Sequence, residues 1–382
     1  MRLSPVLEAT GTYPFVRLEQ AKRRLAAEGV ELIDFGKGDP REETDPLIRR
    51  ALVESIEPFS SYPLAEGLPE LRRAVAGWCR RRFGVELDPE AEVIPTYGSK
   101  EAIFHLAQVV LDPDADKRTV ATTEPGYPVY DRGALFAGGE VEPLPLLEEN
   151  GFLPDLEAVA DELWERTAIL WINYPNNPTG ATAPLDFLER AAALAHEHDF
   201  LLAADEAYTE LWFGSPPHSA LEVSDRANVA VFQTLSKRSS MTGYRSGFVA
   251  APRELIEALR QYRPSVGTAP QEFVQRASIA AWEDEAHVER TRDVYRRKRD
   301  LLLPVLARKG IRVAGSEATI YLWLETPAGE TSERLAERLL EAGLIVSPGS
   351  FFGPSGHGYW RLALVPTEQE CARAAEILER TL

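Results

Sequence analysis

Residues 232–245 read FQTLSKRSSMTGYR and complete an apolar run that begins at Val229. Such a run is typical of a buried strand, and ligands bind at the carboxyl ends of strands in an open α/β sheet. Lys237 and Arg245 are therefore predicted at a binding edge. A lysine amine among apolar or cationic groups can lose its proton and condense with an aldehyde, whereas a guanidinium grips a phosphate through two parallel hydrogen bonds. A Ser-Lys pair alone is more often solvated.

Few lysines compete with Lys237, because the 382-residue chain has only seven. Three that lie in Arg/Glu-rich helical patterns are expected to be solvated: Lys22, Lys298 and Lys309. Lys117 follows a turn, whereas Lys37 and Lys100 lie beside glycines and could touch a ligand. Only Lys237 closes an apolar run, so it is the candidate nucleophile.

The composition favours an enzyme that acts on small molecules. With 44% hydrophobic residues the chain can bury a full core, and a net charge of −18 argues against a nucleic-acid or anionic membrane surface. No apolar run approaches the roughly 18 residues of a membrane span, and no signal peptide is visible. Cys79 and Cys371 lie in helical patterns, which predicts no disulfide and a cytoplasmic location. His196 and His198 are two apart on a helix end, so no metal site is expected.

Short apolar runs alternate with helical patterns through residues 41–285. This alternation predicts a large α/β domain with a mainly parallel sheet between helices. The expected strands are residues 119–123, 168–173, 200–204, 229–232 and 247–250. From Ala286 a long charged helix runs to Lys309, and alternating runs at residues 319–325 and 360–365 follow, with helices between them. We therefore expect a small α+β domain, formed by residues 286–382 together with residues 1–40.

Two further motifs lie where strands are expected to end. Tyr97-Gly98-Ser99-Lys100 opens a helix, whose free N–H groups and dipole favour phosphate, although a structural turn with an N-capping serine is an equal alternative. Asp205 ends a buried run, and a carboxylate there is costly unless it is paired. The pyridinium nitrogen of pyridoxal phosphate (PLP) would pair it, and Tyr208 could then bind the ring oxygen. Alone, Asp-x-x-Tyr is more often a helix start.

Turns with prolines supply two more candidates. In residues 173–180 the prolines and Gly180 make a turn certain, and the side-chain amides, including that of Asn177, could reach a ring substituent. In residues 124–130 Tyr127 lies between turn residues beyond a strand, which suits stacking on a flat cofactor. A packed turn tyrosine explains the second motif equally well.

Together these segments resemble the fold-type I PLP enzymes, in particular the class I and II aminotransferases, in the expected order through nearly the whole chain. The resemblance implies the fold-type I architecture, PLP as the cofactor, and Lys237 as the residue that joins it and exchanges protons with the substrate. The implied contacts to the PLP ring are Asp205 at the nitrogen, Asn177 and Tyr208 at the ring oxygen, and Tyr127 by stacking. The implied contacts to the phosphate are Ser99, Lys100, Thr234 and Arg245.

The same resemblance assigns the outer part of the site. Gly38, in the segment GKGDP, is similar to the glycine whose backbone touches the substrate carboxylate, and Arg361 is similar to the arginine that clamps it. The alternative for Arg361 is a surface arginine at a strand edge. Tyr62 resembles the tyrosine that reaches the phosphate of a neighbouring subunit, which implies a homodimer with shared sites. We expect Lys37 to contact a distal substrate carboxylate, with Arg41 or Arg263 as the next candidates.

The predicted activity is PLP-dependent transfer of an amino group between an amino acid, such as glutamate, and a 2-oxo acid. A narrower resemblance, to N-succinyldiaminopimelate aminotransferases of lysine biosynthesis, is carried by residues 12–15, 274–287 and 347–351. It implies N-succinyl-2-amino-6-oxopimelate as a substrate, with Tyr13 and Asn177 as further substrate contacts. Aspartate, alanine or LL-diaminopimelate aminotransferases and a C–S β-lyase remain open. A PLP-sensing regulator is disfavoured, because no segment is left for a helix-turn-helix module and the negative net charge does not suit DNA binding.

Overall fold

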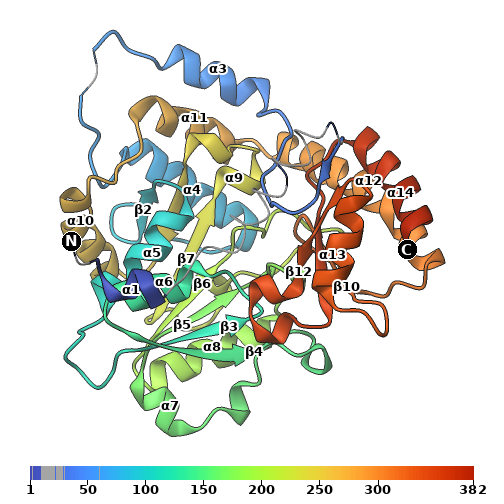
Figure 1. The fold of residues 1–382 in the computed structure, drawn as a ribbon. Helices are drawn as coiled ribbons and strands as arrows, with labels where there is room; N and C mark the ends of the chain where they lie inside the picture. Colours follow the sequence, from blue (N-terminus) through green and yellow to red (C-terminus); the bar gives the residue numbers. More distant parts are fainter. Residues whose placement is uncertain (2, 10–21, 23–28, 30, 60) are drawn as a thin grey trace.

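A seven-stranded sheet forms the centre of the computed structural model, which describes residues 1, 3–9, 22, 29, 31–59 and 61–382 (Figure 1). Its order is β2-β8-β7-β6-β5-β3-β4, and only β8 runs antiparallel to its neighbours. All five expected strands belong to it. The bounds are β2 Val93–Thr96, β3 Thr119–Glu124, β4 Glu140–Pro145, β5 Thr167–Asn173, β6 Leu201–Asp205, β7 Val229–Thr234 and β8 Gly247–Ala250.

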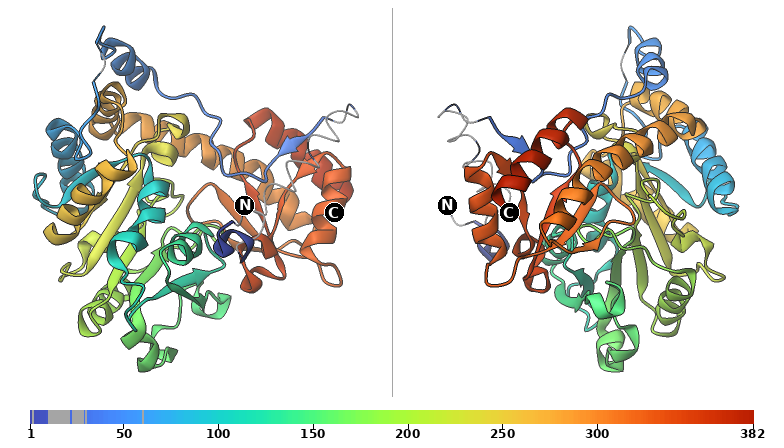
Figure 2. Two further views of the ribbon diagram at one scale, coloured as in Figure 1. Left: turned by 60° about the vertical axis from the view of Figure 1, so that its left-hand side comes forward. Right: turned by 90° about the vertical axis from the view of Figure 1, so that its right-hand side faces the viewer.

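A smaller four-stranded antiparallel sheet packs beside this one, in the order β12-β13-β10-β9. The strands are β9 Val313–Gly315, β10 Tyr321–Glu325, β12 Ser347–Pro348 and β13 Tyr359–Ala363, and the helices around them are α12 Ala286–Arg308, α13 Ser332–Glu341 and α14 Glu368–Thr381. From the N-terminal segment, β1 (Ile33–Asp34) pairs in parallel with β11 (Leu344–Ile345), beside the C-terminal helices (Figure 2). This pairing supports the proposed division into residues 41–285 and residues 1–40 with 286–382, which stays a proposal.

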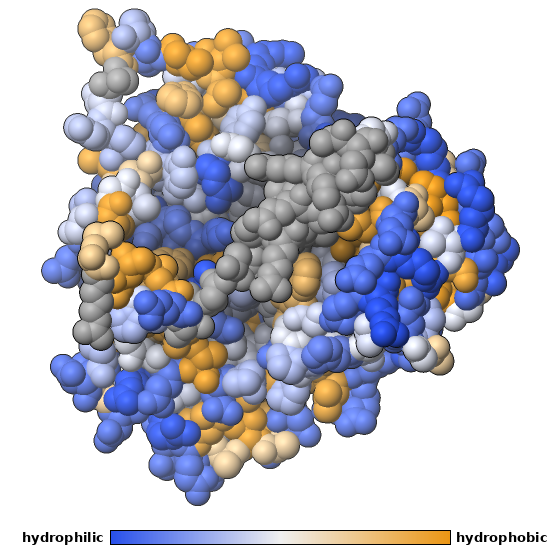
Figure 3. Space-filling view, viewed as in Figure 1, coloured by the Kyte–Doolittle hydropathy of each residue, from blue (hydrophilic) through white to orange (hydrophobic). Residues whose placement is uncertain are grey.

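Helix α3 (Pro46–Glu54) lies at the margin of the chain (Figures 1 and 2), where it packs against α11 (Glu272–Glu283) and buries Ile48 in the hydrophobic core. Apolar atoms gather on the surface over this helix (Figure 3). The exposed apolar residues of this region are Leu47, Val53, Ile56, Phe59, Tyr62 and Leu64. Within the described ranges, the structure has no helix that is long and apolar enough to cross a membrane.

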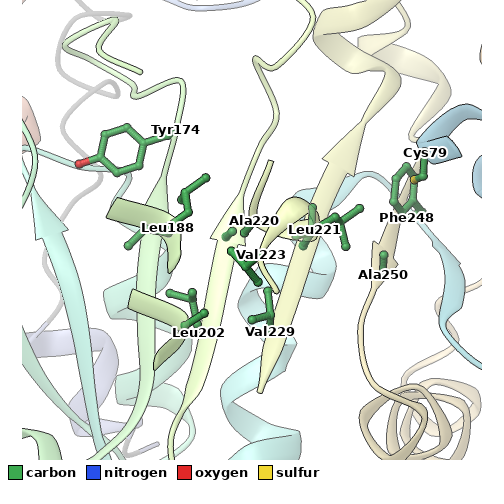
Figure 4. Packing of buried hydrophobic residues seen from close by; sticks show 14 of the residues in the cluster. Cys79, Tyr174, Leu188, Leu202, Ala220, Leu221, Val223, Val229, Phe248 and Ala250 are labelled. Carbon is green, nitrogen blue, oxygen red and sulfur yellow. The ribbon is translucent and has the colours of Figure 1, made fainter. Parts of the chain in front are cut away.

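Helices cover both faces of the seven-stranded sheet apart from its largely exposed edge strand β4, and successive strand residues point to opposite faces. In β5, Leu170 and Ile172 enter one hydrophobic cluster, whereas Ile169 and Trp171 enter the other. The first cluster, part of which Figure 4 shows, includes residues of α4 (Pro69–Phe83), α8 (Leu185–Glu197) and α11 (Glu272–Glu283). The second includes residues of α5 (Ser99–Val110), α6 (Val129–Phe136) and α10 (Arg253–Val266). Within the described residues, the remaining α-helices are short: α1 Pro5–Ala9, α7 Asp161–Arg166 and α9 Leu235–Arg238. These layers confirm the expected α/β class.

One lysine lies where the sequence pattern did not place it. Lys298 was expected to be solvated, and that prediction is wrong, because its side chain is only 2% exposed. Its ammonium forms an ion pair with Glu42 and donates to the Leu364 carbonyl at 3.2 Å. The neighbouring arginines suggested an exposed helix face, but Lys298 follows Tyr295 and precedes Leu302 at helical spacing on the buried face of α12.

Candidate active site

The carboxyl ends of the parallel strands meet at one edge of the large sheet, as the strand order requires. Together with β10, β13 and the segment before α3, they line a cavity of about 370 Å³. The sequence-predicted residues that line this cavity are Gly38, Ser99, Lys100, Tyr127, Asn177, Asp205, Tyr208, Thr234, Lys237, Arg245 and Arg361. Tertiary packing therefore brings residues from distant parts of the chain to one place.

Of the predicted site residues that the structure describes, Tyr62 is not part of this cavity. Tyr62 has a fully exposed side chain on the segment that follows α3. Tyr13 lies outside the described residues. Lys37 lines the cavity, whereas its two alternatives bind elsewhere: Arg41 pairs with Glu370 at 3.0 Å, and the buried Arg263 pairs with Glu101 at 2.9 Å.

Lys237 lies in the single turn of α9, directly after β7. Thr234 caps this turn, since its hydroxyl accepts the Ser236 N–H at 3.1 Å. The Lys237 ammonium donates to the carbonyl oxygen of Gly38. Burial above all, together with the charges of Arg361 and Arg245, lowers the pKa of Lys237 to about 8, although the charge of Asp39 opposes this change. A lysine with this pKa has an appreciable uncharged fraction near neutrality, which a nucleophile or a base requires.

Asp205 ends β6 and is buried at the floor of the cavity. Its carboxylate accepts a hydrogen bond from the Tyr130 hydroxyl at 2.8 Å and one from the Ala207 N–H at 3.2 Å. Burial nevertheless raises the pKa of Asp205 to about 6. Among the residues that the structure describes, no lysine or arginine forms an ion pair with it. A cationic ring nitrogen in the cavity would supply the missing charge, so this carboxyl fits PLP.

The other end of the cavity is built to hold an anion. Gly98 has a φ of 70° and precedes α5 without a side-chain cap, so the first N–H groups of the helix remain available. A Cβ at Gly98 would collide with the guanidinium of Arg245, and only glycine permits this approach. Arg245 donates to the Thr242 carbonyl at 2.8 Å, but its contacts to Ser236 and Tyr97 are long, at 3.4 Å each. The arrangement fits the phosphate of PLP.

Arg361 lies on β13 and is held on several sides. Its guanidinium donates to the Asn177 side chain at 2.8 Å and to the Gly36 carbonyl at 2.7 Å. The carbon atom of the guanidinium lies 4.1 Å from the ring centre of Tyr321 and 4.5 Å from that of Phe352. A planar cation with a fixed orientation beside the cavity suits a carboxylate, which it can bind through two parallel hydrogen bonds.

Sequence reasoning missed three aromatic residues that contact the predicted site. Tyr130 binds Asp205, Tyr321 forms a 2.8 Å hydrogen bond with Tyr208, and Phe352 covers Arg361. Tyr130 and Tyr321 stand inside segments that the sequence marked as a turn motif and a strand. Nothing in their local pattern separates them from ordinary core aromatics, because only the partner across the cavity gives them a role.

A family model described as aminotransferase class I and II matches residues 30–378. The chain belongs to this family. The aminotransferase is 40% identical over 374 residues to the LL-diaminopimelate aminotransferase of Syntrophobacter fumaroxidans, and the match covers 96% of each chain. An aspartate aminotransferase single mutant of Thermus thermophilus superposes with a TM-score of 0.92 at 34% identity over the full length of both chains.

A probable N-succinyldiaminopimelate aminotransferase, also of Thermus thermophilus, superposes with a TM-score of 0.89 at 30% identity, covering 96% of this chain and 100% of the other. These matches confirm the fold type I that the sequence resemblance implied. The chain is a PLP-dependent aminotransferase.

The lowered pKa of Lys237 predicts how the apoenzyme takes up PLP. The uncharged amine attacks an aldehyde, so the rate of uptake should rise with a midpoint near pH 8 rather than near 10.5, the ordinary value. The visible absorbance of bound PLP follows the reaction, and Nα-acetyl-lysine measured under the same conditions serves as the control. A rate that still climbs tenfold per pH unit between about pH 9 and 10 would contradict the burial argument.

Proposed function

We propose that this aminotransferase moves an amino group between a diaminopimelate compound and the glutamate/2-oxoglutarate pair. Relatives that are 37–41% identical and match 95–99% of this chain carry the name LL-diaminopimelate aminotransferase. This supports LL-diaminopimelate ahead of its N-succinyl derivative, which the narrower sequence resemblance favoured and which the T. thermophilus neighbour supports. The observation that carries the proposal is one cavity that joins Lys237, the carboxylate-binding geometry of Arg361 and a further cation, Lys37.

The proposed roles follow from the two ends of the cavity. When bound, PLP supplies an aldehyde for the amino group and a protonated ring that accepts electron density. We propose that Asp205 pairs with the ring nitrogen, that Tyr208 and Asn177 bind the ring oxygen, and that Tyr127 stacks on the ring. The proposed phosphate contacts are Ser99, Lys100, Thr234 and Arg245. The proposed contacts to the substrate carboxylate are Gly38, through its backbone, and Arg361.

Lys237 is proposed to take the proton from the substrate Cα and to return it as an acid. Its pKa of about 8 suits both directions, because the amine is neither fully charged nor too weak a base near neutral pH. The segment 36–38 supports this role. The Gly38 carbonyl accepts from Lys237, and the Gly36 carbonyl accepts from Arg361. This short backbone segment therefore sets the distance between the proposed base and the cation proposed to bind the substrate carboxylate.

A substrate panel with purified holoenzyme tests the proposed substrate. LL-diaminopimelate, its N-succinyl derivative, aspartate and alanine serve as amino donors, with 2-oxoglutarate as the acceptor. We expect the highest kcat/KM for a diaminopimelate compound, and release of ammonia from a thioether substrate reports the C–S lyase alternative. A higher kcat/KM for aspartate or alanine would refute the substrate proposal and leave the aminotransferase assignment intact.

Lys37 is the proposed contact for the distal end of the substrate. Its backbone lies between Gly36 and Gly38, whose carbonyls bind Arg361 and Lys237. Its side chain lines the cavity. Glutamate and LL-diaminopimelate each carry a carboxylate far from the reacting carbon. A long cationic side chain that emerges beside the Cα is placed to meet that carboxylate.

Replacing this ammonium by an apolar group of similar length tests the contact. In Lys37→Met the KM for glutamate and for LL-diaminopimelate should rise about tenfold or more, because a charged hydrogen bond is lost, and the KM for alanine should rise much less. The control is Lys117→Met, since Lys117 binds the His198 carbonyl outside the cavity. Equal changes for alanine and for the dicarboxylic substrates would leave Lys37 without a role in specificity.

We also propose that the enzyme is a homodimer in which Tyr62 reaches the phosphate of the partner subunit. The support is an exposed apolar region around α3 that includes this tyrosine (Figure 3). An exposed apolar patch of this kind is unfavourable in water unless a partner covers it. We also propose a cytoplasmic location, which is supported by two buried cysteines, Cys79 and Cys371, that form no disulfide.

Mixed dimers test whether sites are shared. Lys237→Ala subunits lack the base and Tyr62→Ala subunits lack the proposed phosphate contact, so each variant alone should have little activity. After the two are mixed, unfolded and refolded together, hybrid dimers contain one intact site, because Lys237 and Tyr62 come from different subunits. The mixture should exceed either parent in activity. A mixture that only averages the parents would show that the sites are not shared.

A further inference from the structure

Tyr321 connects the two proposed halves of the active site. It begins β10, is buried, and lines the cavity. Its hydroxyl lies 2.8 Å from that of Tyr208, with the two rings edge to face at a centroid distance of 5.4 Å. The guanidinium carbon of Arg361 lies over the face of this ring, 4.1 Å from the ring centre. A single side chain thus contacts the tyrosine proposed for the cofactor and the arginine proposed for the substrate.

The backbone before Tyr321 is strained to hold this position. Thr319 has a φ of 72°, which a β-branched residue rarely adopts, and such strain is concentrated at functional sites. Its hydroxyl accepts the Tyr321 N–H at 3.0 Å, and its own N–H donates to the Leu211 carbonyl at 2.6 Å. Leu211 in turn donates to the Tyr208 carbonyl at 2.9 Å. The start of β10 and the turn that carries Tyr208 therefore form one hydrogen-bonded unit.

The two hydroxyls share one hydrogen bond, and its direction can be deduced. Each phenol has a single proton, so only one of them donates to the other. Among the described residues, the Tyr321 hydroxyl has Tyr208 as its hydrogen-bond partner. If Tyr208 donated, the buried Tyr321 proton would be left without an acceptor, which is costly. The Arg361 cation over the Tyr321 ring also favours Tyr321 as the donor.

We propose that Tyr321 is a positioning residue that donates its proton to Tyr208 and so directs the Tyr208 proton into the cavity, toward the ring oxygen of PLP. The inference rests on the proposed contact between Tyr208 and that oxygen. It adds a role for a residue of the C-terminal sheet in tuning the cofactor. A donated hydrogen bond makes the Tyr208 hydroxyl a stronger donor in turn, because such bonds polarise one another.

The test is the pH titration of the visible absorbance of bound PLP in the holoenzyme. Tyr208→Phe removes the donor to the ring oxygen, which should raise the midpoint by about one pH unit, since the anionic form of that oxygen loses a charged hydrogen bond. Tyr321→Phe should raise the midpoint in the same direction by a smaller amount. In a Tyr208→Phe background, Tyr321→Phe should add no further shift, because its effect passes through Tyr208.

The outcomes separate the two claims. An unchanged midpoint in Tyr208→Phe overturns the proposed cofactor contact and the Tyr321 inference with it. A shift in Tyr208→Phe but none in Tyr321→Phe overturns the inference alone, as does an equal effect of Tyr321→Phe in both backgrounds. The control is Tyr359→Phe, which removes a hydroxyl that binds Glu148 outside the cavity and should leave the midpoint in place.

A second variant keeps the proposal testable if Tyr321→Phe does not fold. Fluorotyrosine incorporated at position 321 changes the size of the side chain little but makes the phenol more acidic and a stronger donor. The midpoint should then fall, opposite to the Phe variant. A rise would mean that Tyr321 accepts from Tyr208, and it would overturn the proposed direction of the hydrogen bond.

Discussion

Burial of charge at the carboxyl edge of the large sheet is the constraint on which the site depends. Asp205 and Lys237 are removed from water. Burial raises the pKa of Asp205 and lowers the pKa of Lys237, because it disfavours the charged form of each group. In water the Lys237 amine would carry a full charge and show little nucleophilic or basic reactivity near neutral pH, whereas the buried Asp205 carboxylate requires a cationic partner. The apolar layers on both faces of the sheet create the low-dielectric setting, so the hydrophobic core and the chemistry have the same origin.

The cavity exists only because the C-terminal sheet packs against the large one. The hydrogen bonds that join its walls include those of Arg361 to Asn177, Lys237 to Gly38, and Tyr208 to Tyr321. Each bond links residues more than 100 positions apart in the chain. The strained conformation of Thr319 shows that local backbone geometry yields to this packing, since the tertiary contacts compensate for the strain.

Charge also separates the two ends of the cavity. Arg245 and the start of α5 attract an anion at one end, while Arg361 and Lys37 provide positive charge for the substrate at the other. Asp205 supplies negative charge at the cavity floor. This ordering explains how a protein with a net charge of −18 can bind an anionic cofactor and anionic substrates, because the local field, and not the total charge, acts on the ligand.

The sequence by itself determined five of the seven strands of the large sheet, helices between them and the loops that carry polar residues, because short apolar runs and turn chemistry are local properties of the chain. The same local signals marked Asp205 and Lys237 as strand-end residues. Tertiary structure alone decided that Lys298 is buried and that Tyr130 and Tyr321 contact Asp205 and Tyr208. These residues look like ordinary surface or core positions in sequence, since their roles come from partners that only long-range packing brings within hydrogen-bond distance.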